Sequence, residues 1–278
     1  MLIKSYAKIN LSLTINKKIE KKRLHDIQSH FCLINLFDLI SIKRNKKNVD
    51  QISFEGPHSK YVKKSNNSIK KILKIMRKFK LISDYYSIKV HKQIPVFAGL
   101  GGGSSNAASL LKFLSKRKIE DKIFNKIIDL SGSDLRLFFY NQGILQSLKK
   151  IVKFKKKYKL FFLVVYPNIK CSTREVYSKV KNYNKKKVLN QHHKNKAALI
   201  NQIFNLNNDL QSIVEKKYPV IQKLLLNISN EKGCYFSRMT GSGSACYGLF
   251  RDKSSSKVAL KKLRKKYPKF WFSIAKTI

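Results

Sequence analysis

The chain has 278 residues, of which 43% are hydrophobic, so it can bury a substantial core and hold two domains. Its four cysteines form no C-x-x-C pair, which indicates neither a zinc site nor a redox motif and favours reduced, mostly buried thiols. We find no signal peptide and no apolar run long enough to span a membrane, so we expect no membrane partner and a cytoplasmic location.

The charge is strongly one-sided, with 60 Lys and Arg against 15 Asp and Glu, a formal net charge of +45. One interpretation is nucleic-acid binding. However, the basic residues are spread along the whole chain, together with abundant Asn, Ile, Phe and Tyr, the residues of A/T-rich codons. We therefore favour compositional drift, with most of the charge on a solvated surface. Such a surface attracts anionic substrates and binds nucleic acid only non-specifically and in a salt-sensitive way.

The first predicted element is a half-buried strand, because apolar and polar residues alternate over residues 9–16. This pattern places Lys8, Asn10 and Ser12 together on the opposite face, where solvated side chains are the default. Residues 24–29 then carry His25, a residue type that is usually structural or solvated when it stands alone. An apolar stretch over residues 31–42 predicts a further strand.

A helix is predicted next, because Asn67 precedes apolar residues at helical spacing between Ile69 and Met76 and is a good N-cap. After it, alternation around Ile88 predicts a strand, and a glycine cluster at residues 99–103 leads into another helical pattern. A glycine loop between a strand and a helix suits phosphate, because the helix offers unpaired N–H groups and the positive end of its dipole.

Two common phosphate loops do not fit this glycine cluster. A Walker loop needs Lys after its last glycine, whereas Ser104 follows Gly103 here. The dinucleotide fingerprint needs an acidic residue about twenty positions further on, at the end of a second strand, and none stands there. A tight structural turn without a ligand remains the alternative.

The second half of the chain again predicts helices, strands and a glycine loop. Residues 119–130 predict a helix that Gly132 closes, and Asp134 follows it, where a simple cap is the default. Residues 160–165 predict a buried strand, and residues 182–196 a mobile loop in which His192 and His193 form no supported metal site. A second glycine loop follows at residues 238–246, and a helix and a strand end the chain.

Several of these segments resemble the GHMP small-molecule kinases. The loop Pro-Val-Phe-Ala-Gly-Leu-Gly-Gly-Gly-Ser-Ser-Asn, from Pro95, is similar to their phosphate loop. Ala-Lys-Ile-Asn-Leu, from Ala7, and Met-Thr-Gly-Ser-Gly-Ser-Ala-Cys, from Met239, resemble motifs of one branch. That branch phosphorylates the 2-hydroxyl of 4-diphosphocytidyl-2-C-methyl-D-erythritol in the non-mevalonate (MEP) route of isoprenoid biosynthesis, giving the 2-phosphate and ADP.

The resemblance implies an α+β fold of two domains, at residues 1–153 and 154–278. The first domain would be ribosomal-protein-S5-like and bind ATP, the second would be ferredoxin-like, and the active site would lie in the cleft between them. ATP and Mg²⁺ are the implied cofactors, without a dedicated protein metal site. We expect a monomer or a weak homodimer that acts on a small molecule and has no specific nucleic-acid partner.

The resemblance also assigns residues. Asp134 would be the catalytic base, and Lys8 beside it would keep it ionised and stabilise the developing alkoxide. The residues expected to bind the nucleotide are Lys92, Pro95, Val96, Phe97, Ala98, Gly99, Leu100, Gly101, Gly102, Gly103, Ser104 and Ser105. The residues expected to bind the substrate are Asn10, His25, Thr173, Tyr177, Gly241, Ser242 and Gly243.

The chain departs from the family pattern at four positions. Leu24 replaces the tyrosine that faces cytosine, Arg23 replaces a glycine before it, Phe97 replaces a glycine, and Arg136 replaces a proline. Three alternatives stay open, of which the second is suggested by these departures. They are a homoserine-type or mevalonate-type GHMP kinase, an enzyme with reduced activity, and a basic nucleic-acid-binding protein that has kept the fold.

Overall fold

The computed structural model describes residues 1–19, 24–63, 65–115, 119–186, 189 and 192–278, which fall into two compact units. Unit 1 consists of Met1–Ala7, Leu36–Val96 and Gly101–Phe139. Unit 2 consists of Lys8–Asn35, Phe97–Leu100 and Tyr140–Ile278. Both units draw on early and late parts of the chain, and the predicted division at residues 153 and 154 stays a prediction.

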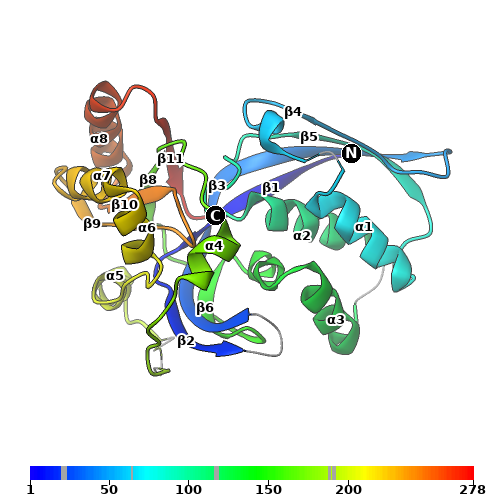
Figure 1. Cartoon of the computed structure of the whole chain (residues 1–278), viewed down its shortest axis with the longest axis horizontal. Helices are drawn as coiled ribbons and strands as arrows, with labels where there is room; N and C mark the ends of the chain where they lie inside the picture. The colour runs from blue at the N-terminus through cyan, green and yellow to red at the C-terminus, as the bar shows by residue number, and fades with distance from the viewer. Residues whose placement is uncertain (20–23, 64, 116–118, 187–188, 190–191) are drawn as a thin grey trace. The chain divides into compact units, whose positions relative to one another are not determined.

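Unit 1 is a sheet with helices. Strand β5 pairs antiparallel with the end of β3 and parallel with β4, so that Ile88 lies opposite both Ile42 and Ile52. Figure 1 shows α1, α2 and α3 on one side of these strands. The elements that lie wholly or partly in this unit are β1 (Leu2–Asn10), β3 (Leu24–Asn45), β4 (Gln51–Glu55), η2 (Ser59–Tyr61), α1 (Ser68–Lys78), β5 (Tyr85–His91), α2 (Gly102–Leu114), α3 (Asp121–Ser131) and η3 (Ser133–Phe139).

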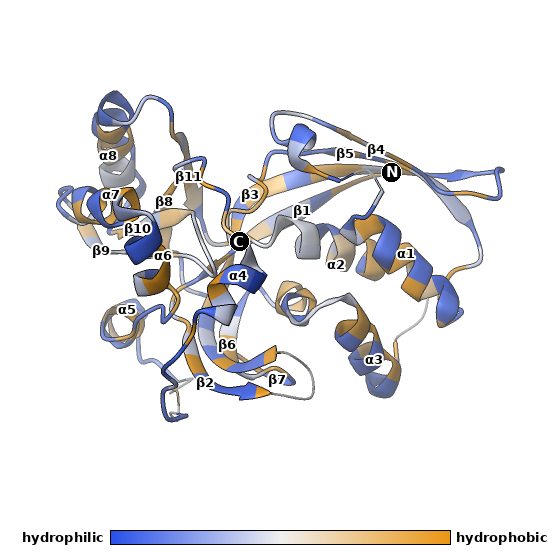
Figure 2. Cartoon of the chain, in the orientation of Figure 1, coloured by the Kyte–Doolittle hydropathy of each residue, from blue (hydrophilic) through white to orange (hydrophobic). Residues whose placement is uncertain are grey.

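Helix α1 begins and packs as its sequence predicts. The Asn67 side chain accepts hydrogen bonds from the N–H groups of Ile69 and Lys70, which satisfies two donors that the first turn leaves open. Its apolar residues, Ile72 among them, are buried, and Figure 2 shows hydrophobic and hydrophilic stripes along the helix. The strand predicted around Ile88 and the helix after the glycine cluster are confirmed as β5 and α2.

Unit 2 contains an antiparallel sheet in the order β11-β8-β10-β9, with α7 packed on β9 and β10 and α8 packed on β8 and β11. This arrangement suits the ferredoxin-like expectation. A further antiparallel group joins β2, the start of β3, β6 and β7. The elements are β2 (Thr14–Ile19), β6 (Gln142–Ser147), β7 (Lys150–Lys153), β8 (Phe161–Tyr166), α4 (Thr173–Ser178), α5 (Lys196–Phe204), α6 (Gln211–Lys217), α7 (Pro219–Ser229), β9 (Cys234–Met239), β10 (Cys246–Phe250), α8 (Lys253–Lys266) and β11 (Trp271–Lys276).

The strand predicted over residues 9–16 is wrong in two respects. The chain leaves β1 after Asn10 and enters β2 only at Thr14. Both faces of this stretch are also buried, since Lys8, Asn10 and Ser12 are each no more than 3% exposed. The break follows from Leu13, whose N–H donates to the Asn207 carbonyl (2.9 Å) rather than to a neighbouring strand.

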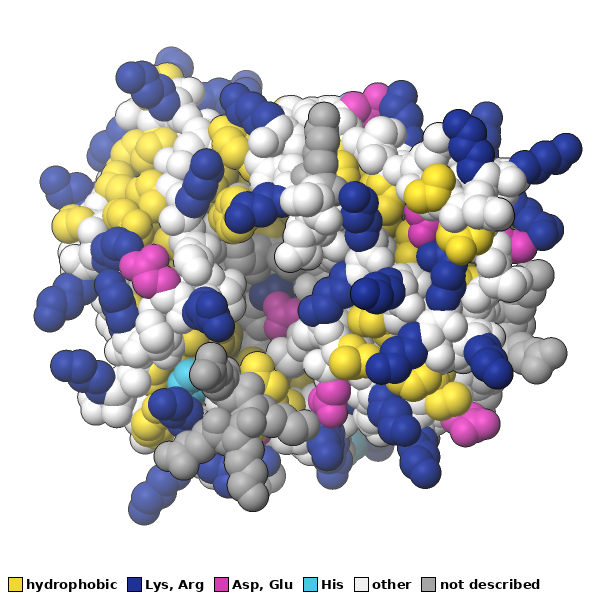
Figure 3. Space-filling model, turned by 45° about the vertical axis from the view of Figure 1, so that its right-hand side comes forward, with side chains coloured by type: hydrophobic (Ala, Val, Ile, Leu, Met, Phe, Trp, Pro, Cys, Tyr) yellow, Lys and Arg dark blue, Asp and Glu magenta, His cyan; other side chains and the backbone are white. Residues whose placement is uncertain are grey.

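The distribution of basic side chains and the burial of the cysteines agree with what the composition predicts. Figure 3 shows Lys and Arg side chains scattered over the viewed face rather than gathered on one element. The cysteines are free, and all but the partly buried Cys234 are buried. Burial raises the pKa of the Cys32 and Cys246 thiols, which leaves them protonated and unreactive. In the described part of the chain, no helix is long and apolar enough to cross a membrane.

A buried polar network links the end of β1 and the residues after it to β3. Ser29 Oγ accepts a hydrogen bond from Asn10 Nδ2 (2.8 Å) and donates to the Ser12 carbonyl (2.5 Å). His30 is fully buried, and its Nδ1 lies 3.0 Å from Ser12 Oγ. Burial, together with the nearby His193 and Arg238, lowers the pKa of His30 from 6.5 to about 3.

This burial predicts a loss of stability in mild acid. Below pH 6.5 the unfolded chain protonates His30 while the folded chain does not, so the free energy of unfolding falls as the pH drops towards 3. We expect a His30 contribution of about 2 kcal/mol between pH 7.5 and pH 5. Urea unfolding of wild type and His30→Asn at both pH values measures it. The control is His91→Asn, whose ring is 40% exposed. Equal pH dependence in wild type and His30→Asn would contradict the assignment.

Candidate active site

The glycine loop of unit 1 ends in an open helix N-terminus. Helix α2 follows Gly101, whose φ of 71° is in the left-handed region and which supplies no side-chain cap. The first-turn N–H groups, from Gly102 onwards, therefore have no capping side chain. Gly103 is exposed, and a Cβ there would touch only the Ser68 side chain at 3.4 Å. A helix of 13 residues with an uncapped glycine start fits the phosphates of a nucleotide.

A buried ion pair supports the chain that enters this loop. The Lys92 ammonium bonds to the Asp38 carboxylate, and both residues are at most 3% exposed. The same carboxylate accepts the N–H groups of Gln93 (2.8 Å) and Ile94 (2.9 Å). A Cβ on Gly102 would lie 3.4 Å from Lys92 Nζ, so the ammonium lies under the start of α2. The predicted contact of Lys92 with the nucleotide stays a prediction.

The two serines after the glycines differ. Ser104 is half-buried, whereas Ser105 is 1% exposed, with its hydroxyl donating to the Tyr6 carbonyl (2.6 Å) and accepting from Ser5 (2.7 Å). The Ser105 N–H donates to the Gly101 carbonyl. Each of these polar groups of Ser105 thus has a protein partner, and the hydroxyl fixes α2 to β1. Of the residues before the glycines, Pro95 is buried and Val96 is half-buried.

Asp134 lies half-buried in η3, directly after the turn at Gly132, whose φ is 129°. Helix α2 packs against η3. The unusual Arg136 is accommodated within the same unit, since its guanidinium donates to Asn125 Oδ1 (2.6 Å) and covers the Phe124 ring at 5.2 Å. Asp134 belongs to unit 1 and Lys8 to unit 2, and their pairing stays a prediction.

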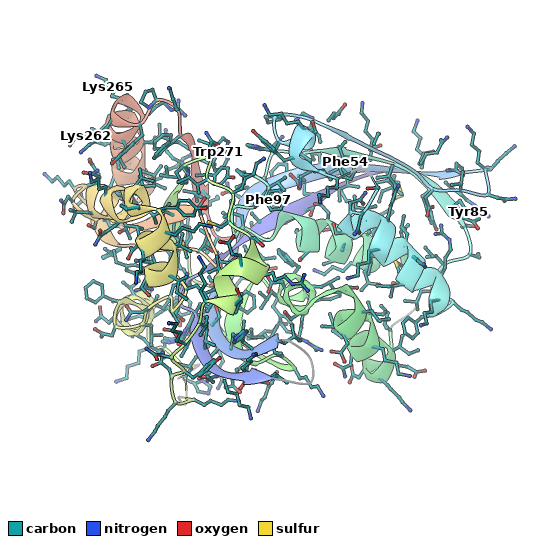
Figure 4. All side chains as sticks on the ribbon, viewed as in Figure 1. Phe54, Tyr85, Phe97, Lys262, Lys265 and Trp271 are labelled. Carbon is teal, nitrogen blue, oxygen red and sulfur yellow. The ribbon has the colours of Figure 1, made fainter. Side chains whose placement is uncertain are left out.

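In unit 2, the segment Phe97–Leu100 packs against the second glycine loop. The Ala98 carbonyl accepts the N–H of Ala245 (3.1 Å), and a Cβ on Gly99 would overlap the Thr240 carbonyl oxygen. The small residues of both loops thus let their backbones approach closely. Phe97 has a φ of 61° and is 45% exposed, so its position favours glycine and its ring packs little (Figure 4).

The Lys8 cluster lies beside this loop. Lys8 Nζ bonds to Asn10 Oδ1, and Lys8 N–H donates to the Leu100 carbonyl (3.0 Å). The Asn10 N–H donates to Thr240 Oγ1 (3.0 Å). A Cβ on Gly241 would lie 2.9 Å from Lys8 Nζ and 3.2 Å from Asn10 Oδ1. The structure thus brings Lys8, Asn10 and Gly241 together. The Lys8 ammonium and the Asn10 amide lie against the backbone of Gly241, which has no side chain.

Two further groups of predicted substrate residues meet in unit 2. The His25 and Tyr177 ring centroids are 5.1 Å apart, with the planes inclined at 35°. Thr173 Oγ1 and Ser242 Oγ lie 2.9 Å apart. Gly243 lies against Met239, where a Cβ would meet the sulfur at 2.5 Å. Arg23, one of the four departures, lies outside the described residues.

Three further residues support the site. Asn208 Nδ2 donates to the Met239 and Gly241 carbonyls, both at 2.8 Å, which gives Asn208 a structural role. The sequence interpretation missed Asp38, an undistinguished strand residue to which only the scarcity of acids in this chain could have pointed. Arg238 is 5% exposed and donates to the Leu11 and Ile203 carbonyls, which connects β9 to the residue after β1 and to α5.

The side chains of the described residues indicate how a metal ion could be held. Among the described residues, no group of three or more His, Cys, Asp or Glu side chains could hold an ion. Mg²⁺ commonly binds through phosphates, water and one or two carboxylates rather than through a protein cage. Asp134 is a carboxylate in unit 1, the unit that carries the open N-terminus of α2. These residues fit a metal that arrives with the nucleotide.

Comparison with known proteins identifies the family. A model described as GHMP kinases N terminal domain matches residues 67–132, and one described as GHMP kinases C terminal matches residues 186–269. Together they cover more than half of the chain, which therefore belongs to the GHMP kinase family.

Full-length relatives narrow the class. A protein of Pelagibacter ubique is 39% identical over 99% of this chain and 98% of its own length. A protein of Caldanaerobacter subterraneus subsp. tengcongensis is 32% identical over 99% of this chain and 96% of its own length. Both are named 4-diphosphocytidyl-2-C-methyl-D-erythritol kinase.

Solved structures show the same fold. A crystal structure of 4-(cytidine 5'-diphospho)-2C-methyl-D-erythritol kinase has a TM-score of 0.73 at 20% identity, with 99% of each chain covered. A homoserine kinase from Cytophaga hutchinsonii has a TM-score of 0.64 at 14% identity, covering 100% of this chain and 94% of its own. The predicted α+β fold of the GHMP kinase family is confirmed, and the chain forms it with two sheets.

The contact between the loops predicts that Gly99→Ala unfolds the site. A methyl group there overlaps the Thr240 carbonyl, and Gly99 also has a φ of 75°. We expect a loss of at least about 3 kcal/mol in the free energy of unfolding, measured by urea denaturation. The matched control is Gly103→Ala, where a Cβ meets only Ser68 at an ordinary distance. Equal stabilities of the two variants would contradict this packing.

The ion pair predicts a second effect. Asp38→Asn leaves the Lys92 ammonium buried without its carboxylate, which typically costs about 3–5 kcal/mol. We expect a lower urea midpoint, and weaker ATP binding by calorimetry at temperatures where the variant is folded. Asp50→Asn is the control, because Asp50 pairs with Arg77 in the same unit at 15% side-chain exposure, away from the loop. A folded Asp38→Asn protein with normal ATP affinity would refute the support role.

Proposed function

We propose that the protein transfers the terminal phosphoryl group of ATP to the tertiary 2-hydroxyl of 4-diphosphocytidyl-2-C-methyl-D-erythritol. The reaction belongs to the non-mevalonate route to isoprenoids. The observation that carries this proposal is the full-length similarity to kinases of that name, at up to 39% identity. The Lys8, Asn10 and Gly241 cluster supports it, because it joins the two motifs that mark this branch.

The glycine loop is proposed to bind the nucleotide. Bound ATP supplies the phosphoryl group, and Mg²⁺ neutralises charge on the phosphates. The N–H groups at the start of α2 hold the phosphates, and the Asp38–Lys92 pair keeps the loop in place. Catalysis of phosphoryl transfer is mainly positioning and electrostatic stabilisation, which a pre-formed loop provides.

Asp134 is proposed as the general base. Its carboxylate accepts the proton of the 2-hydroxyl as the new oxygen–phosphorus bond forms and ADP leaves with the electrons of the broken bond. Lys8 stabilises the negative charge that develops on the 2-oxygen. Lys8 is only 3% exposed, and in such a water-poor place an electrostatic interaction is stronger than in solvent. Asn10 fixes the Lys8 side chain by accepting its hydrogen bond.

The substrate is proposed to bind through unit 2. His25 and Tyr177 face the cytosine, while Thr173, Ser242 and Gly243 line the path of the diphosphate and the sugar alcohol. A net charge of +45 attracts such an anionic substrate. We place the reaction in the cytoplasm and expect nucleic acid to bind only non-specifically, with binding that disappears at high salt.

The position of the new phosphate tests the reaction. The 2-carbon of the acceptor carries no hydrogen, so a phosphomonoester there shows no three-bond coupling to a proton. We expect purified protein, ATP, Mg²⁺ and the cytidyl substrate to give a new singlet in the proton-coupled phosphorus NMR spectrum. A multiplet would place the phosphate on a primary or secondary hydroxyl and refute the proposed regiochemistry.

A variant tests the base. Asp134→Asn removes the proton acceptor, and loss of general-base catalysis typically lowers the rate by about 10²–10⁴-fold. We expect kcat to fall by that factor in an ADP-release assay, with ATP affinity by calorimetry unchanged. Asp129→Asn, at an exposed position on α3, is the control. Near-normal turnover of Asp134→Asn would exclude it as the base.

A further inference from the structure

The base-binding end of unit 2 lacks one aromatic residue. Leu24 stands on β3 where the related kinases have tyrosine, and its side chain is 37% exposed. A leucine offers a pyrimidine apolar contact but no π-face, and stacking is the main way in which proteins hold single bases. Either the site binds cytosine weakly, or another residue supplies the missing ring.

A second tyrosine lies beside His25. The ring of Tyr183 is stacked with that of His25, with centroids 6.2 Å apart and planes inclined at 24°. Tyr177 flanks the same imidazole at 5.1 Å. Tyr183 is 42% exposed, so part of its ring surface is open to a ligand. Three flat rings thus gather at His25, the residue that follows Leu24 on β3.

The segment that carries Tyr183 is held in place. The Asn184 N–H donates to the Ile15 carbonyl, and Asn184 Nδ2 donates to Asp209 Oδ2, both at 2.8 Å. Asp209 Oδ2 also accepts the Ile15 N–H (2.7 Å). Lys186 lies 3.8 Å from Asp26, next to His25. Of the loop predicted over residues 182–196, this part is therefore fixed to β2 and β3, and residues 187–188 and 190–191 lie outside the described residues.

We propose that Tyr183 supplies the aromatic surface that Leu24 does not, so that the pyrimidine of the substrate binds among Tyr183, His25 and Tyr177. This inference rests on the proposed function, because it assumes a cytidyl substrate. It adds a residue from a different segment of the chain to the site that the family resemblance predicts.

The chemistry of His25 suits this arrangement. Partial burial, with a smaller contribution from Lys18, lowers the pKa of His25, so its imidazole is neutral at pH 7. A neutral imidazole has one donor and one acceptor. The edge of cytosine likewise offers an amine donor beside ring-nitrogen and carbonyl acceptors. Stacked tyrosines then orient the base, while His25 forms hydrogen bonds with its edge.

Binding of CDP tests the proposal without turnover. CDP carries the base but no acceptor hydroxyl, and a non-hydrolysable ATP analogue keeps the nucleotide site occupied during calorimetry. Tyr183→Leu should raise the Kd of CDP by about 5-fold to 150-fold, the range for loss of one stacked aromatic. Tyr183→Phe should bind like wild type. Tyr235→Leu, which removes a tyrosine of 43% exposure from β9, is the control.

A compensating change separates stacking from structure. Leu24→Tyr in the Tyr183→Leu background should restore CDP affinity and the KM for the cytidyl substrate, with the KM for ATP constant throughout. A ring introduced at position 24 on β3 would not replace a tyrosine whose role is merely structural. Tyr183→Gln serves if the leucine variant does not fold.

The outcomes are distinct. Unchanged CDP affinity in Tyr183→Leu and Tyr183→Gln, with normal binding by wild type, would overturn the role of Tyr183 alone. Loss of affinity without rescue by Leu24→Tyr would assign Tyr183 a structural role and also overturn it. Failure of wild type to bind CDP or to use the cytidyl substrate would overturn the proposed function as well.

Discussion

The close approach of Gly241 to Lys8 and Asn10 is the constraint on which unit 2 depends. No side chain fits at Gly241, because a Cβ would lie 2.9 Å from the Lys8 ammonium and 3.0 Å from the Gly99 carbonyl. The second glycine loop, the Phe97–Leu100 segment and the end of β1 must therefore meet as bare backbone. That contact holds the buried Lys8 ammonium in place, and in the proposed mechanism this ammonium stabilises the negative charge on the 2-oxygen.

Buried cations recur in a chain whose surface already carries a large positive charge, and each has its own partners. Lys92 has the Asp38 carboxylate, and Arg238 has backbone carbonyls together with the face of Phe236 at 4.5 Å. Such groups are costly to desolvate and are retained only when their hydrogen bonds are satisfied. The solvated lysines need no partners. Drift in composition can therefore change the surface while the few buried cations stay.

Local signals in the sequence predicted local structure well. The Asn67 cap, the strand before the glycine loop and the α2 helix depend on neighbours within a few residues, and all were recovered. The break after Asn10 was not, because it depends on the distant Asn207 carbonyl. For the same reason, residues within recognisable motifs could be proposed as site residues from the sequence, whereas Asp38 was missed. Its partners lie more than fifty positions away, and no pattern in the sequence indicates them.

The most direct test of the central claim is ADP release by the purified protein with ATP and Mg²⁺. The acceptors compared are 4-diphosphocytidyl-2-C-methyl-D-erythritol, homoserine, mevalonate and none. A kinase built around this Lys8 cluster and this base site should release ADP rapidly only with the cytidyl acceptor. Equal or faster release with homoserine or mevalonate, or no release with any acceptor despite measurable ATP binding, would contradict it.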